Sequence, residues 1–248
     1  MKKLSFIAAL LLIAAITACS GKSSGSKNKL IIGTDATWPP MEYLNANKEI
    51  IGFDIDLMKA VAEAGGFEVE FVNAAWDGIF AALDNGKFDA VISSITITDE
   101  RKNSMDFSIP YINAGQVLVI KKDLTGVETL ADLKGKSVGA QIGTTGAMEI
   151  TNSGATLKNY DELGLAMEDL ANGRIDGVVC DTPIAANFAL QNEKYKPVLK
   201  IAGKPFTQEF YGIAVKKGNS EIVEKINTGL KAVIDSGKTD ELEKQWLR

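Results

Sequence analysis

One run of nine residues, 93–101, carries the side chains best suited to bind a small charged molecule. It reads Ser-Ser-Ile-Thr-Ile-Thr-Asp-Glu-Arg and directly follows an apolar segment, so its hydroxyl groups can point into a cleft. Arg101 ends the run, and its planar guanidinium matches a carboxylate with two parallel hydrogen bonds. The alternative is a solvent-exposed arginine paired with Asp99 or Glu100, and the spacing alone leaves both interpretations open.

A second candidate for anion binding is the sequence Gly-Thr-Thr-Gly at residues 143–146, between a predicted strand and a predicted helix over residues 147–151. The first backbone N–H groups of a helix have no partner within it, and together with the helix dipole they favour an anion. Thr144 and Thr145 are therefore candidate ligand residues. A loop that only caps the helix explains the same residues equally well.

Two carboxylates follow predicted strands directly, where they can meet a cationic or hydrogen-bond-donating ligand. Asp181 could pair with an ammonium group, or it could cap a helix that begins near Pro183. Asp35 could accept from a donor on the ligand, or it could shape the turn before the two prolines at residues 39–40.

Aromatic side chains form the third part of the candidate site. Trp38 and Trp76 lie in or near loops after predicted strands, where each could flank a ligand or pack in the core. A cation over a desolvated aromatic face is stabilised by about 1–2 kcal/mol. Cys180 is expected to be a small buried apolar residue.

Composition excludes several classes of function. The 248 residues contain no histidine, which removes Ser-His and Cys-His nucleophile pairs and histidine metal sites. Lys and Arg number 27 against 32 Asp and Glu, and an acidic chain without a basic run is a poor candidate for binding nucleic acid. No motif marks a nucleotide, metal or flavin, so we expect no cofactor, no metal and no catalytic residue.

The amino-terminal residues predict export. Lys2 and Lys3 precede an apolar run over residues 4–16, which is too short to span a membrane and is typical of a signal peptide, here residues 1–18. Residues 16–19, Ile-Thr-Ala-Cys, resemble a bacterial lipobox, which would make Cys19 the lipid-modified first residue of the mature chain. Residues 19–29 would then form a flexible, lipidated tether. The alternative is secretion with a free Cys19.

The remaining residues alternate between strand and helix patterns, which predicts an α/β fold with largely parallel sheets. The expected strands cover residues 29–33, 68–72, 88–92, 116–120, 136–140, 174–179 and 211–215. The expected helices cover residues 54–64, 76–84, 162–171 and 221–234. Asp54 is expected to cap the first helix, and Gly65 and Gly66 to end it.

An internal repeat suggests two similar lobes. Residues 83–93, LDNGKFDAVIS, resemble residues 170–180, LANGRIDGVVC, at a constant offset of 87. Each copy reads as a helix, an Asn-Gly stop, an aspartate and a strand, and open α/β sheets bind ligands beyond the carboxyl ends of strands. The alternative is a common helix-to-strand junction that recurs by chance.

These positions together resemble the polar amino-acid branch of the bacterial extracellular solute-binding proteins. The motifs are GTDATWPPME, GFDIDL, ITDER, DFS, GTT and YGIA, at residues 33–42, 52–57, 97–101, 106–108, 143–145 and 211–214. The likeness runs from about residue 30 to the end. Proteins similar to this serve as receptors for ABC importers of glutamine, histidine, lysine, arginine or cystine.

The resemblance implies a type II periplasmic-binding-protein fold, in which two Rossmann-like lobes joined by a two-strand hinge close on an amino acid. Lobe 1 would comprise residues 30–110 and 212–248, and lobe 2 residues 116–206. Residues 111–115 and 207–211 would form the hinge. A ligand that touches both lobes would stabilise only the closed state.

The resemblance also assigns roles to site residues. Family residues that match Arg101 and Thr145 bind the α-carboxylate, and those that match Ser94, Thr96 and Asp181 bind the α-ammonium group. Those that match Trp38 and Trp76 flank the side chain, while Asp35 and Gln141 match positions that read its tip. Ser93 and Thr144 complete the predicted ligand-binding set.

The expected ligand is arginine or another basic amino acid, because Asp35 and two tryptophans suit a guanidinium or ammonium group. Glutamine is the alternative, although glutamine binders often carry Lys where Gln141 stands and His where Cys180 stands. Two further candidate functions are a lyase of the same fold, with Asp35 as its general acid, and a ligand sensor. We expect a monomer outside the cytoplasm, held at the membrane through Cys19 and served by an ABC permease and ATPase.

Overall fold

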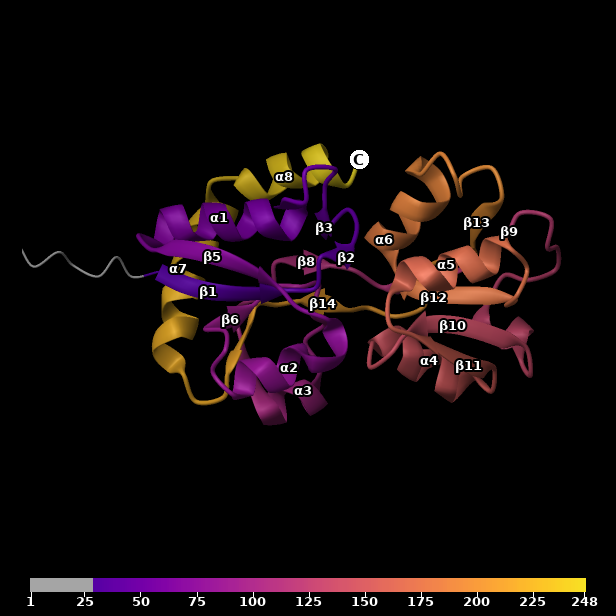
Figure 1. Cartoon of the computed structure of the whole chain (residues 1–248), viewed down its shortest axis with the longest axis horizontal. Helices are drawn as coiled ribbons and strands as arrows, with labels where there is room; N and C mark the ends of the chain where they lie inside the picture. Colours follow the sequence, from indigo (N-terminus) through magenta and orange to yellow (C-terminus); the bar gives the residue numbers. More distant parts are fainter. Residues whose placement is uncertain (1–28) are drawn as a thin grey trace, which may run out of the picture.

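The structure, a computed structural model, describes residues 29–248 and shows two lobes side by side, joined by thin connections (Figure 1). Each lobe contains a five-stranded sheet with helices packed on it. This is the predicted two-lobed α/β architecture. The predicted signal peptide, Cys19 and residues 19–28 of the predicted tether lie outside the described residues.

The sheet of lobe 1 has the order β5-β1-β6-β15-β7. Its strands are β1 (Lys29–Thr34), β5 (Glu68–Asn73), β6 (Ala90–Val91), β7 (Met105–Phe107) and β15 (Ala214–Lys216). Its helices are α1 (Phe53–Gly65), α2 (Trp76–Asp84), α3 (Asp99–Ser104), α7 (Ser220–Asp235) and α8 (Lys238–Trp246). A small antiparallel sheet of β2 (Thr37–Trp38), β3 (Glu42–Leu44) and β4 (Ile50–Ile51) completes the lobe.

The sheet of lobe 2 has the order β11-β10-β12-β9-β13. Its strands are β9 (Gln116–Lys121), β10 (Ser137–Gln141), β11 (Thr156–Tyr160), β12 (Gly177–Asp181) and β13 (Leu199–Ala202). Its helical segments are η1 (Leu130–Leu133), α4 (Thr145–Ser153), α5 (Leu163–Ala171), α6 (Thr182–Ala186) and η2 (Asn187–Gln191).

One strand of each sheet runs against the other four. Strand β15 is antiparallel to both of its neighbours in lobe 1, and β9 is antiparallel to both of its neighbours in lobe 2. The strands joined by helical crossovers are parallel, as such connections require. The sheets are therefore largely parallel, as predicted, except at the strand by which the chain enters each lobe from the hinge.

The internal repeat marks equivalent places in the two lobes. Strands β6 and β12, which end its two copies, are the third strand of their sheets. The Oδ2 atom of Asp89 accepts a hydrogen bond of 2.7 Å from the backbone of β1, and that of Asp176 accepts one of 2.9 Å from β10. Because both aspartates fasten a neighbouring strand in the same way, the repeat reflects common architecture rather than chance.

The start of α1 differs from the prediction. Its N-cap residue is Gly52, and the Asp54 side chain does not cap the helix. Instead the buried Asp54 carboxylate accepts hydrogen bonds from the Ser94 backbone and the Tyr111 hydroxyl, at 2.8 and 2.9 Å. The helix ends at Gly66 in the left-handed conformation, as predicted. Asp54 therefore binds Ser94 and Tyr111 through tertiary contacts instead of capping the helix.

The predicted strand over residues 211–215 is two strands. Strand β14 (Phe210–Tyr211) pairs with β8 (Ile112–Asn113), whereas β15 begins only at Ala214 and joins the sheet of lobe 1. The antiparallel pair β8–β14 lies on the side of lobe 1 that faces lobe 2, where the chain crosses between the lobes (Figure 1). Next to it, a side chain at Gly115 would stand 2.2 Å from a backbone oxygen of the returning segment, so glycine permits the close approach of the two crossings.

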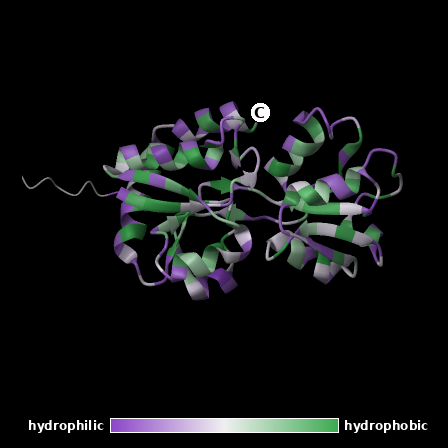
Figure 2. Cartoon of the chain, in the orientation of Figure 1, coloured by the Kyte–Doolittle hydropathy of each residue, from purple (hydrophilic) through white to green (hydrophobic). Residues whose placement is uncertain are grey.

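The strands at the centre of each lobe are mostly hydrophobic, while the outward faces of the helices are hydrophilic (Figure 2). One cluster of buried apolar residues runs from lobe 1 into lobe 2 and includes Tyr111, Ala114 and Tyr211, which lie in or next to the β8–β14 pair. Helix α7 crosses α1 so closely that a side chain at Gly229 would meet the Val61 carbonyl oxygen at 2.2 Å.

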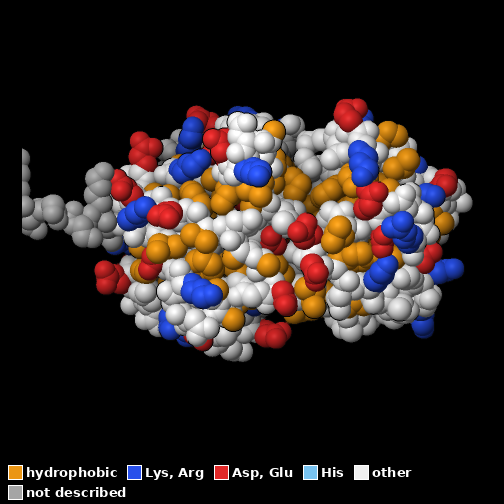
Figure 3. Space-filling view, viewed as in Figure 1, with side chains coloured by type: hydrophobic (Ala, Val, Ile, Leu, Met, Phe, Trp, Pro, Cys, Tyr) orange, Lys and Arg blue, Asp and Glu red, His pale blue; other side chains and the backbone are white. Residues whose placement is uncertain are grey.

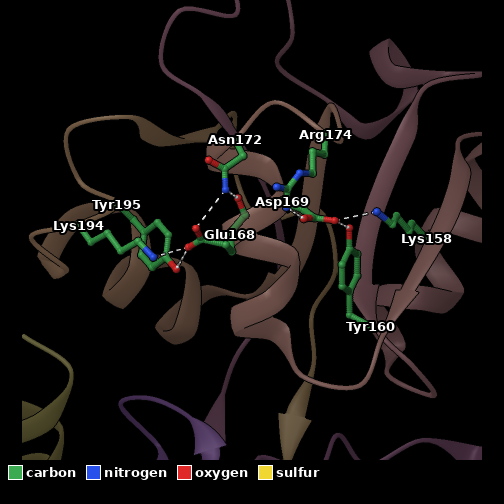
Figure 4. A network of polar contacts seen from close by, with 8 residues as sticks. All are labelled: Lys158, Tyr160, Glu168, Asp169, Asn172, Arg174, Lys194 and Tyr195. Carbon is green, nitrogen blue, oxygen red and sulfur yellow. Dashed lines mark hydrogen bonds and ion pairs between the residues drawn. The ribbon is translucent and has the colours of Figure 1, made fainter.

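A polar network on the outside of lobe 2 fastens α5 to its neighbours (Figure 4). Asp169 accepts from Lys158, Tyr160 and Arg174 at 2.7–2.8 Å, and these hydrogen bonds hold its pKa below the ordinary range. Glu168, the next residue, accepts from Lys194, Tyr195 and Asn172. These contacts link α5 to β11 and to the segment after η2.

Candidate functional site

A pocket lies between the two lobes. It is lined by Asp35, Trp38, Glu42, Trp76, Ser93, Ser94, Thr96, Arg101, Gln141, Thr144, Thr145 and Asp181. The fold thus brings together every residue of the predicted ligand-binding set and adds Glu42. The role of each residue toward a ligand stays a prediction.

The ends of four strands explain why these residues meet. Asp35 follows β1, Ser93 and Ser94 follow β6, Gln141 ends β10 and Asp181 ends β12. The strands are parallel within each lobe, so their carboxyl ends lie at one edge of the sheet. The two sheets present these edges to each other across the hinge, which creates a polar pocket from residues far apart in sequence.

Arg101 lies in α3 at the boundary of the lobes and is only 9% exposed. Its guanidinium donates to the Thr96 carbonyl oxygen at 2.9 Å and, across the lobes, to the Gly143 carbonyl oxygen at 3.2 Å. The rings of Trp76 and Phe80 lie 5.5 and 5.3 Å from its Cζ atom. The alternative of a solvent-exposed arginine paired with Asp99 or Glu100 is therefore wrong. Burial lowers the pKa of Arg101 from its usual high value.

The start of α4 faces Arg101 from lobe 2. Helix α4 begins at Thr145, two residues earlier than predicted, and the Thr144 hydroxyl caps it by accepting from the Ala147 backbone at 3.3 Å. The capping interpretation thus holds for Thr144, and both threonines still line the pocket. Backbone N–H groups in the first turn of this helix can meet an anion bound at Arg101.

Asp181 is buried in the lining of the pocket, and its side chain does not cap α6. One of its oxygens accepts from the Gln116 amide at 3.0 Å. Burial, and secondly the nearby carboxylate of Glu209, raise the pKa of Asp181 to about 7. A cationic group beside Asp181 would relieve this penalty, because it would pair with the ionised form.

Asp35 follows β1 and lines the pocket from lobe 1. Its carboxylate accepts from the Thr37 hydroxyl and, across the lobes, from the Gln141 amide, each at 2.9 Å. Burial raises the pKa of Asp35, and the nearby Glu162 adds to the effect. Acidic side chains gather where the two lobes meet on the face shown in Figure 3, with no Lys or Arg among them.

Glu42 is a pocket residue that sequence reasoning missed. Its fully buried carboxyl accepts from the hydroxyls of Ser93 and Ser94 at 3.0 and 3.3 Å. Burial and the neighbouring Asp54 raise its pKa well above the ordinary value. A signal was present, because Glu42 belongs to the motif at residues 33–42, and it pairs across the β2–β3 hairpin with Trp38.

Two further buried polar residues, Gln116 and Glu209, bond to site residues. Gln116 directly follows the first predicted hinge segment and Glu209 lies within the second, which is the only sequence signal that they carry. Cys180, by contrast, is buried in the apolar cluster as predicted, and burial raises its pKa.

Two features are absent from residues 29–248. In that part of the chain, no three His, Cys, Asp or Glu side chains gather so as to hold a metal ion. None of the helices formed by the same residues has the length and apolar character needed to cross a bilayer.

A buried pocket with one guanidinium, several carboxyls and aromatic faces, shared by two lobes around a hinge, defines a two-lobed binding protein for a small charged molecule. The chain belongs to the bacterial extracellular solute-binding proteins, family 3, because the model of that family matches residues 30–248.

Individual relatives match over nearly the whole chain. The ABC transporter arginine-binding protein 1 of Escherichia coli K12 is 38% identical over 244 residues, which cover 96% of this chain and 98% of the relative. The solved structure of an ancestral arginine-binding protein bound to arginine is 43% identical, with a TM-score of 0.84 over 89% of this chain and 99% of that one. An ancestral amino-acid-binding protein described as a precursor of cyclohexadienyl dehydratase is 38% identical, with a TM-score of 0.82 over 89% and 96% of the two chains.

Proposed function

We propose that the chain is the substrate-binding component of an ABC importer and that it clamps a basic L-amino acid, arginine before others, between its lobes. The observation that carries this proposal is the charge of the pocket, whose lining contains one guanidinium, that of Arg101, and three carboxyls, those of Asp35, Glu42 and Asp181. A buried charge requires a partner, so a ligand with two cationic groups and one carboxylate satisfies this set best.

The positions of the charged residues also suggest the orientation of the ligand. The α-carboxylate would lie between Arg101 and the start of α4, and the α-ammonium group would lie at Asp181 and Thr96. The cationic side chain would extend between Trp38 and Trp76 toward Asp35 and Gln141. The relatives named for arginine support this choice of ligand.

Glutamine is the second candidate, and one observation favours it. Burial raises the pKa of both Asp35 and Glu42, so a protonated pair would leave a neutral polar lining suited to an amide. A cationic ligand would instead hold at least one of these groups ionised. Both ligands share the α-ammonium group at Asp181, so the number of protons released by arginine in excess of glutamine separates the two ligands.

The experiment that tests the proposal is a thermal-shift screen of the full chain against the twenty amino acids, followed by calorimetry. A ligand at 100 times its dissociation constant stabilises the folded state by about 2.7 kcal/mol. Arginine, lysine or histidine should give the largest shift, with one molecule bound per chain. A shift by none of the twenty would refute the proposed function.

We further propose binding without turnover, although one relative is a precursor of a dehydratase. Asp35, the candidate general acid, is held by Thr37 and Gln141, which suits a fixed acceptor better than a proton donor to a leaving group. Recovery of unchanged ligand after prolonged incubation supports a receptor, whereas a dehydrated product would show an enzyme.

The domain limits and the cellular location are proposals of the same kind. We propose lobe 1 as residues 30–110 and 212–248, lobe 2 as residues 116–206, and residues 111–115 and 207–211 as the hinge. The receptor would act as a monomer outside the cytoplasm, after removal of residues 1–18, with a lipid on Cys19. Metabolic labelling with palmitate in a bacterial host should mark the wild-type chain and not the Cys19→Ser variant.

A further inference from the structure

Glu209 belongs to the returning hinge segment, immediately before β14, and is 9% exposed. A single oxygen of its carboxylate, Oε2, accepts from the hydroxyls of Thr96 and Thr145, each at 2.7 Å. Thr96 follows the central strand of lobe 1, and Thr145 opens α4 of lobe 2. One carboxylate oxygen on the hinge therefore bonds to both lobes at once.

The surrounding contacts fix this carboxylate in place. Its other oxygen accepts from the Thr207 hydroxyl at 2.8 Å. Residues 95–97 run beside the hinge strand, because Ile97 and Gly212 each donate a backbone hydrogen bond across the two segments. The Gln116 amide approaches Thr145 at 3.1 Å, Asp181 at 3.0 Å and Glu209 at 3.4 Å. Glu209 therefore has little freedom to turn away from the two threonines.

The hydrogen-bond arrangement determines what the two hydroxyls can offer a ligand. A hydroxyl has one proton to donate, and both threonines donate theirs to Glu209. Toward the pocket Thr96 can then only accept, which suits an ammonium group and not a carboxylate. The Thr145 hydroxyl likewise cannot donate to the ligand carboxylate, so at this position only its backbone N–H group can do so.

We propose that Glu209 is a positioning residue with two effects. It holds the two lobes together without ligand, and it leaves the Thr96 and Thr145 hydroxyls as acceptors toward the ammonium subsite, because it accepts the hydrogen bonds that they donate. The first effect does not depend on the identity of the ligand. The second rests on the proposed function, since it concerns the α-ammonium group of an amino acid. The two effects are tested separately.

The first test measures the distance between the lobes in ligand-free protein. Spin labels are placed at Lys244→Cys in α8 of lobe 1 and at Glu193→Cys after η2 of lobe 2, both exposed, in full-length chain with Cys19→Ser. Glu209→Ala should shift the distance distribution toward longer values. Glu209→Gln retains an acceptor oxygen and should stay close to wild type. The control Gln208→Ala, an exposed neighbour, should change nothing.

Thr145→Val provides an independent version of the first test, because it removes the Thr145–Glu209 bond between the lobes and leaves the bond from Thr96 to Glu209 in place. It also removes an acceptor for Gln116, but that contact lies within lobe 2. It should lengthen the interlobe distance as Glu209→Ala does, and the double variant should add little to either single change. An unchanged distance in both single variants would overturn the first effect. So would a Glu209→Gln variant as open as Glu209→Ala, because charge rather than hydrogen bonding would then hold the lobes.

The second test compares calorimetric binding of L-arginine with binding of 5-guanidinopentanoate, the same molecule without its α-ammonium group. Wild-type protein should prefer arginine strongly, and Glu209→Ala should reduce this preference at least fivefold, while Glu209→Gln restores most of it. If the role of Glu209 were purely structural, Glu209→Ala would weaken the binding of both ligands equally and leave the ratio of the two affinities unchanged. That result would overturn the second effect. If wild-type chain binds neither ligand, arginine is the wrong ligand and the second effect is tested with the amino acid found in the thermal-shift screen, whereas the interlobe distances still decide the first effect.

Discussion

The Gln141 amide of lobe 2 donates a hydrogen bond of 2.9 Å to the Asp35 carboxylate of lobe 1. The same nitrogen donates at 2.8 Å to the Asp161 carbonyl oxygen, so both of its protons are used. Toward the pocket, Gln141 can then offer only its carbonyl oxygen, beside the carboxylate of Asp35. This corner of the pocket presents acceptors to the tip of a ligand side chain, which favours a tip that donates hydrogen bonds.

Asp35→Asn should weaken arginine binding by about 10- to 100-fold, because a charge-assisted hydrogen bond contributes about 1.5–3 kcal/mol. If glutamine binds, its affinity should fall much less. Calorimetry with both amino acids measures the two changes. Asp77→Asn, which neutralises an exposed acid in the first turn of α2, is the matched control and should alter neither affinity by more than about twofold. Equal losses for both ligands would show that Asp35 does not read side-chain charge.

Arg101→Ala should reduce amino-acid affinity by several kcal/mol, about 2–5, because the ligand carboxylate would be buried without its partner. Arg101→Lys should recover only part of this loss, since an ammonium group cannot form two parallel bonds. The control Lys102→Ala removes the neighbouring exposed cation, which pairs with Asp99. Wild-type affinity in Arg101→Ala would contradict the assignment of the carboxylate end.

Ligand-free stability should fall as pH rises from about 4 to about 7. The pKa of Asp181 is raised to about 7 and that of Asp54 to about 6, from an ordinary value of 3.8. In this window the folded chain holds protons that the unfolded chain has released, so rising pH favours unfolding. Denaturant unfolding measured at each pH without ligand provides the test, and Asp181→Asn should flatten the slope.

Affinity for an amino acid should change with pH in the opposite sense. An ammonium group pairs with ionised Asp181, so binding must expel the proton that Asp181 holds below pH 7. Affinity should therefore rise with pH, by at most tenfold per unit, and level off above about 7. Calorimetry in buffers of different ionisation enthalpy should detect proton release at pH 6. Affinity independent of pH between 5 and 8 would argue against an ammonium group at Asp181.

Gly229→Ala should destabilise lobe 1 by about 1–3 kcal/mol, because the added methyl group would meet the Val61 carbonyl oxygen where α7 crosses α1. Gly164→Ala, in α5, is the matched control: its side chain would extend into open space, and alanine is the better helix former. The control should be neutral or stabilising by up to about 1 kcal/mol. Urea unfolding of both variants measures the difference in the free energy of unfolding.

Local sequence patterns account for most of the framework. Alternating apolar segments indicated the strands, and Asn-Gly pairs placed the ends of α2 and α5 next to their C-cap residues, Asn85 and Asn172. Because the carboxyl ends of parallel strands meet at one edge, the same patterns also gathered Asp35, Ser93 and Asp181 into one pocket. Boundaries were less accurate, and residues 211–215 form parts of two strands because the hinge pair takes up Tyr211.

By itself the sequence determined the α/β alternation, the repeat and the kinds of charge available, since these follow from the order of residues along the chain. Only the tertiary structure decided how those charges are used. The spacing of residues allowed Arg101 to be either exposed or buried. In the structure Arg101 is buried, because Gly143 of lobe 2 approaches it and accepts its hydrogen bond. Glu42 and Glu209 look like ordinary surface acids in the sequence, and their surroundings come from segments 51 and 113 residues away. Desolvation and hydrogen bonding depend on such distant neighbours, which no local pattern encodes.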